Sequence, residues 1–208
     1  MRDGDYADSQ IIKLRKLHRG LFWRLNLEND AVPIRKERVY FSYRDILDGK
    51  ARMLLPDHFT PMPETLIWLR YPSENRPQLI LSGKDPTDNI GVSCVERNGR
   101  DLQKALVVMR EAIRETMPES VFYDTGSITA KNCTGYWFEY KSFTINDEAY
   151  NLQFLLGSEQ AILLGVFNCS MRFFEDWRTA IIKSLAYTEM FERRPEHNER
   201  LSDRNHTI

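Results

Sequence analysis

Long hydrophobic runs are missing from this chain of 208 residues. No stretch approaches the roughly 20 apolar residues that cross a bilayer, so we expect no transmembrane segment. The N-terminal residues MRDGDYADSQ are polar and contain no hydrophobic core of a secretory signal. We therefore expect no signal peptide and a cytoplasmic location.

Cysteine and histidine are scarce, which limits the metal and redox chemistry available to the chain. The cysteines, Cys94, Cys133 and Cys169, are isolated and odd in number, as expected for free thiols in a reducing compartment. The histidines are His18, His58, His197 and His206. No two of them have the spacing of zinc ligands, so we expect no metal site and no cofactor.

An excess of charge of either sign is also missing, because the chain has 29 basic and 30 acidic residues and a net charge of −1. Whole-domain binding of nucleic acid usually needs a basic excess, so we expect no nucleic-acid partner. The hydrophobic content of 42% is ordinary for a globular protein. We divide the chain into an N-terminal basic amphipathic extension (1–37), a single α+β domain (38–190) and a disordered tail (191–208).

The N-terminal extension carries apolar residues at helical spacing with basic residues between them. The apolar residues are Ile11, Leu14, Leu17, Leu21 and Leu25. This pattern indicates a basic amphipathic helix, or two short strands on either side of Gly20. Such a helix could dock on its own domain or on a protein partner, bind nucleic acid or an acidic partner, or make a peripheral contact with an acidic membrane surface. We favour docking on its own domain or on a protein partner, because the run of basic residues is short. The sequence indicates no oligomeric state.

The central zone predicts an antiparallel sheet flanked by helices. The clearest helix begins near Asp101, with Asn98 as a candidate cap, and ends at Pro118. A final helix is expected over 173–187, and one or two helical turns over 63–71. The predicted strands are 49–56, 78–82, 90–96, 121–128, 135–145, 150–156 and 161–168. Short loops join them, so we expect an α+β fold in which residues 161–166, apolar throughout, form a central strand covered on both faces.

Side-chain alternation predicts the register of one hairpin. A two-residue turn would place the charges of Glu139 and Lys141 on the core face of the sheet. A three-residue loop at 146–148 instead pairs Tyr140 with Phe154, and we therefore predict an odd-length loop. The polar reverse face would then carry Glu139, Lys141, Asn151 and Gln153.

Familiar catalytic motifs do not occur in the sequence, which has no G-x-S-x-G, no Walker loop and no dinucleotide fingerprint. Cys94 and Cys169 fall in predicted strands with no histidine nearby to act as a base, so we expect inert core thiols. Asp85, Asp88 and Asn89 offer oxygen ligands to calcium, but a full site needs more ligands. A turn at Asp85 explains the same residues by chain reversal.

The segment from Arg70 to Pro77 (RYPSENRP) is the strongest candidate for a binding site. Its arginines, tyrosine and asparagine stand on a proline-stiffened loop, and Arg and Tyr are favoured at protein interfaces. The alternative is a rigid connector whose Tyr71 packs on the core. Together with the polar sheet face, the candidate protein-binding residues are Arg70, Tyr71, Asn75, Arg76, Glu139, Lys141 and Gln153.

Several short stretches carry a family resemblance that spans residues 38–190. They are Gly49-Lys50, Leu54-Leu55-Pro56, Phe59, Tyr71–Pro77, Val121-Phe122-Tyr123 with Gly126, Gly135–Phe138, Leu163–Cys169 and Glu175-Asp176-Trp177. In these stretches the chain resembles a group of uncharacterised bacterial proteins, chiefly from Firmicutes. The order of the strands and the final helix is also similar to the PsbP-like and Mog-type fold, an antiparallel sheet flanked by helices.

That fold implies a binding role, because its members bind a photosystem, the GTPase Ran, or secreted effectors that they chaperone. None of their binding motifs matches this chain residue by residue, so no functional residue is carried over. Our leading hypothesis is a non-enzymatic adaptor or chaperone-like module that binds another protein. The alternatives are a hydrolase with a dispersed carboxylate site among Glu96, Asp124 and Glu139, and a protein attached to a membrane surface through residues 11–25.

Overall fold

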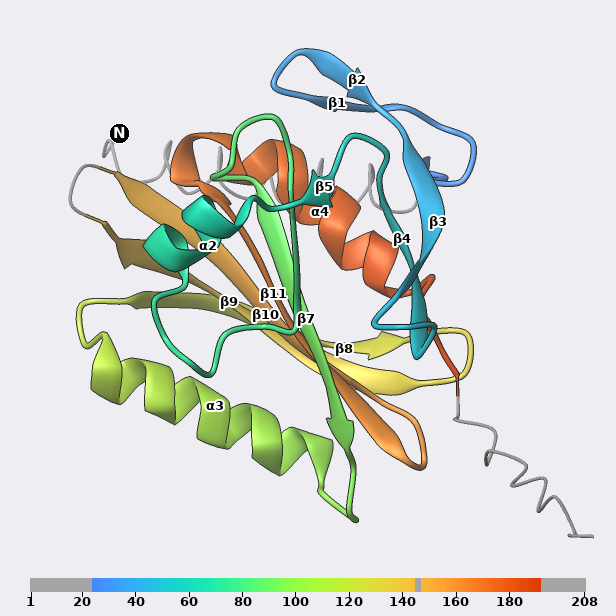
Figure 1. The fold of residues 1–208 in the computed structure, drawn as a ribbon, viewed down its shortest axis with the longest axis vertical. Coiled ribbons are helices and arrows are strands. Elements are labelled where there is room, and N and C mark those ends of the chain that lie inside the picture. The colour runs from blue at the N-terminus through green and yellow to red at the C-terminus, as the bar shows by residue number, and fades with distance from the viewer. Residues whose placement is uncertain (1–23, 145–146, 192–208) are drawn as a thin grey trace, which may run out of the picture.

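The structure is a computed structural model and describes residues 24–144 and 147–191. Its largest feature is a seven-stranded antiparallel sheet in the order β5-β6-β7-β11-β10-β9-β8. The strands are β5 (Thr60–Pro61), β6 (Leu79–Ser82), β7 (Asn89–Glu96), β8 (Val121–Thr129), β9 (Thr134–Phe143), β10 (Glu148–Gly157) and β11 (Ala161–Ser170). Figure 1 shows this sheet crossing the molecule with helices on both sides.

A smaller sheet lies beside the large one and has the order β12-β4-β3. Its strands are β3 (Phe41–Ile46), β4 (Ala51–Pro56) and β12 (Glu189–Met190). A two-stranded hairpin, β1 (Val32–Ile34) with β2 (Glu37–Val39), leads into it. All strand pairs described are antiparallel, as the sequence predicts.

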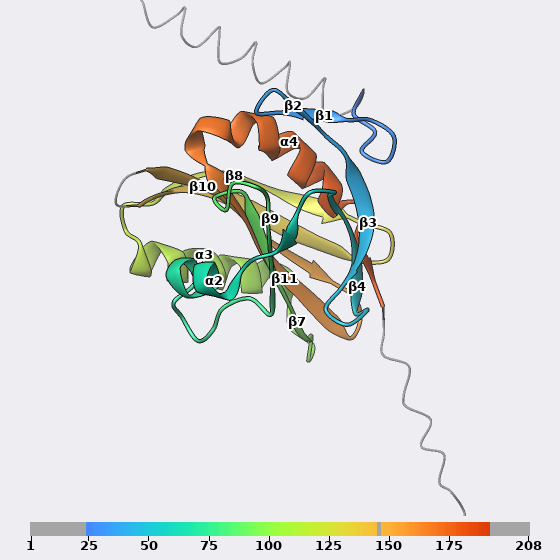
Figure 2. The same ribbon diagram turned by 45° about the horizontal axis from the view of Figure 1, so that its top comes forward.

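The helices cover opposite faces of the large sheet. The helix α4 (Phe174–Leu185), preceded by the 3-10 turn Met171–Phe173, covers one face, whereas α2 (Glu64–Arg70) and α3 (Leu102–Thr116) lie on the other (Figure 2). Each face has its own hydrophobic cluster. The α4 cluster includes Leu152, Phe167 and Trp177, and the α3 cluster includes Leu106, Phe138 and Leu155. The expected α+β fold with an antiparallel sheet is confirmed.

The boundaries of α3 follow from its sequence. The carboxylate of Asp101 accepts a hydrogen bond from the backbone N–H of Lys104 at 3.0 Å, so Asp101 is the N-cap rather than Asn98. The helix ends at Thr116 because Pro118, two residues later, cannot continue it. Leu102 and Leu106 are buried on its inner side.

The strand β11 is the middle strand of the seven, so the predicted central position is confirmed. Leu164 and Val166 are only half-buried, so the predicted full cover on both faces is wrong for the α3 side. The strand lies between β7 and β10 and contributes side chains to both faces. Gly165 is required here, because a Cβ at this position would lie 2.0 Å from the ring of Phe154. The aromatic ring therefore fills the space that a larger residue would need.

The β9–β10 hairpin has a different register from the one predicted. Phe143 pairs with Glu148, so residues 144–147 form a loop of even length, and the predicted odd-length loop is wrong. Glu139 lies opposite Leu152 and faces α4, whereas Gln153 lies opposite Phe138 and faces α3. The predicted polar reverse face therefore does not form.

The α4 cluster begins before the expected domain boundary at residue 38. Leu27, Val32 and Ile34 are buried in it. The predictions for residues 11–23 and for the tail from residue 192 lie outside the described residues. Within the described ranges, no helix is both long enough and apolar enough to cross a membrane.

Candidate functional site

The short helix α2 exposes large apolar side chains instead of burying them. Trp68 is 56% exposed and Leu69 is 76% exposed, whereas Leu66 and Ile67 are half-buried. The helix begins after Pro63 and has no buried residue. Residues 68–76, from the end of α2 through the following loop, form a projecting segment that we call the α2 ridge.

The α2 ridge carries a cation–π pair formed by Trp68 and Arg76. The guanidinium carbon of Arg76 lies 4.3 Å from the centroid of the Trp68 ring, which is cation–π geometry. This contact joins the loop back to the helix and holds both side chains in place. Arg70, at the end of α2, is exposed beside them.

Tyr71 fixes the α2 ridge to the sheet. Its hydroxyl donates to Asn89 Oδ1 at 2.6 Å and accepts from Asn168 Nδ2 at 2.9 Å. The same Asn168 Nδ2 lies 2.9 Å from Asn89 Oδ1, which closes a three-residue network across β7 and β11. Burial raises the pKa of Tyr71 to about 12, although the hydrogen bond from Asn168 lowers it. Tyr71 therefore has the connector role and positions its neighbours.

The other predicted binding residues divide between the two faces of the sheet. Asn75 is exposed on the α2 ridge, where its backbone N–H donates to Ser73 Oγ at 3.1 Å. Gln153 is half-buried on the same face of the sheet as α3. Glu139 and Lys141 lie on the α4 face. The structure thus brings together the residues of the 70–76 segment and leaves Glu139 and Lys141 on the far side.

Glu139 is an internal ion-pair partner with only 3% of its surface exposed. Arg178 of α4 donates to it from Nε at 2.8 Å and from Nη2 at 2.8 Å, and the Tyr150 hydroxyl donates at 2.6 Å. Lys141 pairs with Glu148 at 2.8 Å near the end of the hairpin. These contacts occupy the polar atoms that the predicted surface would have presented to a partner.

The three acids of the hydrolase hypothesis do not form a site. Arg178 Nη2 also donates to Asp124 at 3.1 Å, so one guanidinium holds both Asp124 and Glu139. Glu96 pairs with Ala161 at the start of β11, while Glu139 is level with Phe167, six residues further along that strand. That separation is roughly 20 Å, too far for a shared reaction centre.

The thiols and the calcium candidates are bound into the structure. Cys169 is buried as expected, whereas Cys94 is only half-buried, so the prediction of a core thiol is wrong for Cys94. Burial raises the pKa of Cys94, and it raises the pKa of the buried Cys133 to about 11, so the reactive thiolate is disfavoured. Asp85 and Asp88 bind Arg35 at 2.7 and 2.8 Å. The backbone N–H of Asp88 donates to the carbonyl of Asp85 at 3.0 Å, as the turn interpretation predicts. In the described part of the chain, no three His, Cys, Asp or Glu side chains are grouped to hold a metal ion.

The two flanks of α3 differ in chemistry. Arg110 and Arg114 lie 5.0 and 4.9 Å above the ring of Phe122, so their flank faces β8. Residues three or four apart share a helix face, so the opposite flank carries Ala105, Val108 and Ala112. Val108 is 69% exposed. In the sheet, β8 lies at one edge, and β11 and β7 lie on the other side of β10. The flank of α3 that faces away from β8 is therefore directed toward β11 and β7, and this flank is apolar.

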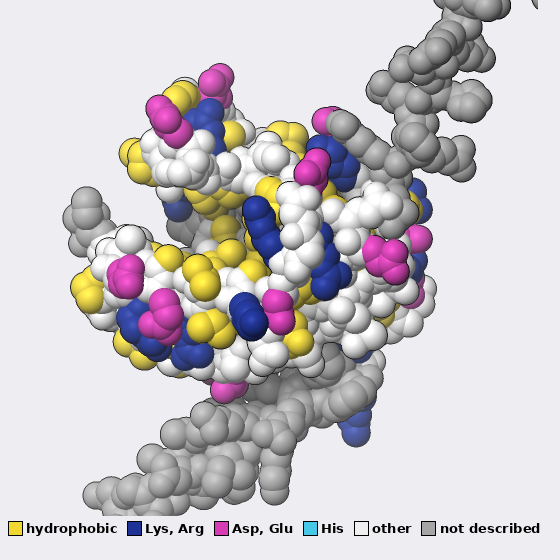
Figure 3. Space-filling view, turned by 90° about the horizontal axis from the view of Figure 1, so that it is seen from below, with side chains coloured by type: hydrophobic (Ala, Val, Ile, Leu, Met, Phe, Trp, Pro, Cys, Tyr) yellow, Lys and Arg dark blue, Asp and Glu magenta, His cyan; other side chains and the backbone are white. Residues whose placement is uncertain are grey.

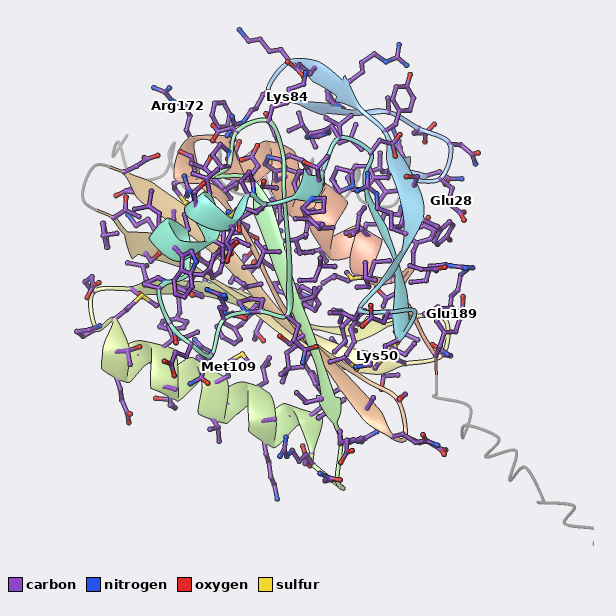
Figure 4. All side chains as sticks on the ribbon, viewed as in Figure 1. Glu28, Lys50, Lys84, Met109, Arg172 and Glu189 are labelled. Carbon is purple, nitrogen blue, oxygen red and sulfur yellow. The ribbon has the colours of Figure 1, made fainter. Side chains whose placement is uncertain are left out.

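The sheet between α3 and the α2 ridge is only partly covered. Leu164 and Val166 of β11 are half-buried there. Pro77 packs against β7, where a Cβ on Gly91 would lie 2.6 Å from its ring. Figure 3, in which α3 is nearest the viewer, shows hydrophobic side chains around a hollow, and Met109 projects from α3 toward the sheet (Figure 4). We call this concavity, bounded by the α2 ridge, Val108, Leu164 and Val166, the α2–α3 hollow.

The sequence predicts the 70–76 loop as a binding segment but does not single out Trp68, Leu69 or Val108. One signal for the first two was available, because Leu66, Ile67, Trp68 and Leu69 are four consecutive large apolar residues in a helix of seven. No orientation of so short a helix can bury all four. Helical periodicity turns Val108 away from the buried stripe of α3, but which neighbouring element it stands beside depends on how α3 crosses the sheet, which its own sequence does not encode.

Comparison with known proteins defines the class of fold. No family model matches the chain, and no curated protein is similar to it in sequence. The solution structure of cyanobacterial PsbP (CyanoP) from Synechocystis sp. PCC 6803 is similar with a TM-score of 0.54 at 6% identity, covering 73% of this chain and 92% of that one. The fold is therefore that of an α+β protein with helices on both faces of an antiparallel sheet. More narrowly, it is PsbP-like.

Two other solved structures show lower similarity. One is PA94 from Pseudomonas aeruginosa, a protein of unknown function described as a putative regulator, with a TM-score of 0.44, 10% identity, and coverage of 74% of this chain and 98% of that one. The other is LpqN, involved in cell envelope biogenesis of Mycobacterium tuberculosis, with a TM-score of 0.47, 14% identity, and coverage of 76% and 95%.

Proposed function

We propose that this protein is a non-catalytic adaptor or chaperone-like module that binds another protein through the α2 ridge. The observation that carries the proposal is the exposed Trp68, with the half-buried Arg76 over its ring and the exposed Leu69 beside it. Trp and Arg are the residues that most often dominate the binding energy of protein interfaces. An isolated surface Leu would be unremarkable, but three such side chains on one fixed projection form a compact anchor.

Pre-organisation of the α2 ridge supports the same function. Tyr71 is tied to β7 and β11, and Arg76 rests on Trp68, so little side-chain freedom is left to lose on binding. In this proposal Arg70, Asn75 and Arg76 contact the partner and Tyr71 positions them. Gln153 lies on the same sheet face, and Glu139 and Lys141 take no part.

The setting of the module is also part of the proposal. We place it in the cytoplasm of a bacterium, with no nucleic-acid partner and no cofactor. Cys94, Cys133 and Cys169 are all free, which fits a reducing compartment. The resemblance of its short sequence stretches to bacterial proteins supports the bacterial part of this proposal.

Site-specific photo-crosslinking in the native cell tests the function. A photoreactive residue at Leu69 should capture a defined protein, whereas one at Tyr40, which is 50% exposed between β2 and β3, should not. The double variant Trp68→Ala/Arg76→Ala should weaken purified complex formation at least about tenfold, because it removes two anchors. Its melting temperature should match that of the Tyr40→Ala control. Equal capture at both positions, or unchanged affinity of the double variant, would contradict the proposal.

A further inference from the structure

The α2–α3 hollow and the α2 ridge are neighbours on one face of the molecule and have matching chemistry. We propose that the hollow is filled by the α2 ridge of a second copy of this chain, in a two-fold symmetric dimer. The inference rests on the proposed role of the α2 ridge as a protein-binding surface, and it identifies the protein bound there as a second copy of this chain. A two-fold interface uses the same patch on both copies, so the patch must contain both halves of the fit.

The α2 ridge and the α2–α3 hollow are complementary in shape and are both apolar. The α2 ridge projects Trp68 and Leu69, both more than half exposed. The hollow beside it has Leu164 and Val166 of β11 at its base, and the exposed Val108 stands on the flank of α3 at its edge. A projecting apolar segment next to an apolar concavity allows reciprocal insertion, which would remove both surfaces from water at the same time.

The ridge and the C-terminal end of α3 also carry charges of opposite sign. Among the described residues, no acid forms an ion pair with Arg70 or Arg76 on the α2 ridge. Glu115 continues the helical row of Val108 and Ala112 on α3, Glu119 follows three residues after the helix ends, and neither has a cation partner within the described ranges. When the ridge of one copy enters the hollow of the other, two cations approach two acids, and the symmetry repeats this contact.

The chain's own N-terminal segment is a poorer occupant of the hollow. It joins the described structure at Arg24, and Leu25 packs against the α4 cluster, on the opposite face of the sheet. To fill the hollow, the N-terminal segment would have to pass around the edge of the sheet. A second copy can approach the hollow directly. Its ridge is already rigid, so association costs little ordering entropy.

Sedimentation velocity of the full chain tests the dimer. The wild-type protein should be dimeric at about 100 µM, and Leu69→Glu on the ridge or Val108→Glu on the hollow should each raise the dimer dissociation constant at least about tenfold. Tyr40→Glu is the matched surface control and should leave the constant unchanged. Circular dichroism and thermal melting confirm that each variant is folded, and two independent variants guard against the failure of one.

Charge reversal makes the test specific for two-fold pairing. Arg70→Glu/Arg76→Glu and Glu115→Arg/Glu119→Arg should each be monomeric alone, because each places like charges at both contacts. Mixed in equal amounts, they should form heterodimers, because both contacts then join opposite charges.

A wild-type chain that stays monomeric, a dimer that survives both Leu69→Glu and Val108→Glu, or a charge-reversed mixture that does not associate would each overturn the inference. The same experiments distinguish failure of the dimer from failure of the proposed function. If the chain is monomeric but crosslinks at Leu69 to a different protein, only the dimer is rejected. If it neither self-associates nor crosslinks, both proposals fail.

Discussion

Arg35 shows how much of the fold can depend on one side chain. It lies in the β1–β2 turn with a φ of 51°, next to Lys36 at 66°, a left-handed conformation that is unfavourable for residues other than glycine. Its guanidinium binds Asp85 and Asp88 and lies 4.0 Å from the centroid of the Phe173 ring. These contacts offset the strain of the turn and attach the hairpin to the sheet.

The two aspartates that bind Arg35 titrate in opposite directions. Burial raises the pKa of Asp88 to about 6, although Arg35 lowers it. Burial also acts upward on Asp85, but hydrogen bonds from Arg35 and Thr87 are stronger together and lower its pKa to about 2. The folded protein therefore binds the proton of Asp88 more tightly than the unfolded chain, and that of Asp85 less tightly.

Asp88 should make the protein less stable as the pH rises. Because its folded pKa lies above the unfolded value of 3.8, its contribution is most favourable below about pH 4 and is lost as the pH passes through about 6. In Asp88→Asn, the free energy of unfolding in urea should vary less between about pH 4 and 7 than in the wild type. A variant with the wild-type slope would show that another group titrates there. Asp85 should act at lower pH, with stability lost as the pH falls from about 4 toward 2.

Among the elements, β9 shows best what sequence patterns could and could not predict. Periodicity placed β7, β9, β10, β11, α3 and α4 within a few residues of their observed bounds, because apolar spacing reports which side of an element faces a core. The register of β9 with β10 was missed because alternation was assumed to keep Glu139 in water. Its partner Arg178 is 39 residues away on α4, and no local pattern encodes that contact.

The candidate site was predicted in part for a similar reason. The loop from Arg70 to Arg76 was recognised from its residue types, which are a local property. The partition of Glu139 and Lys141 to the other face depends on strand register, and the α2–α3 hollow depends on where α3 crosses the sheet. Both are tertiary properties, which a single sequence does not specify by spacing.

The buried carboxylate of Glu139 on β9 should lower the stability of the fold only when its partner Arg178 is removed. Arg178→Met leaves the Glu139 carboxylate buried without a cation and should lower the free energy of unfolding by about 3 kcal/mol. The double variant Glu139→Leu/Arg178→Met replaces the pair with apolar groups and should recover most of that loss. Denaturant unfolding of the two variants measures the difference. If the double variant is as unstable as the single one, the ion pair itself, and not its isolated remnant, determines the stability.

At the scale of the whole molecule, one layer of strands separates two cores. The α4 cluster draws on the smaller sheet and the β1–β2 hairpin, whereas the α3 cluster is formed by α3 and the large sheet alone. The α2 ridge lies on the same side of the large sheet as α3, whereas the β1–β2 hairpin lies on the α4 side (Figure 2). Surface changes on one side should therefore act independently of those on the other.

The strands β9, β10 and β11 alternate their side chains between the two clusters, so neither core can come apart while the other stays intact. Amide protons in these strands should exchange with deuterium only through global unfolding, as one cooperative unit. The β1–β2 hairpin, held at its turn by Arg35, should exchange earlier through a smaller opening. Native-state hydrogen exchange would contradict this if β10 lost its protection at a lower denaturant concentration than the hairpin. Because the two hydrophobic clusters share these three strands, they should unfold in a single transition.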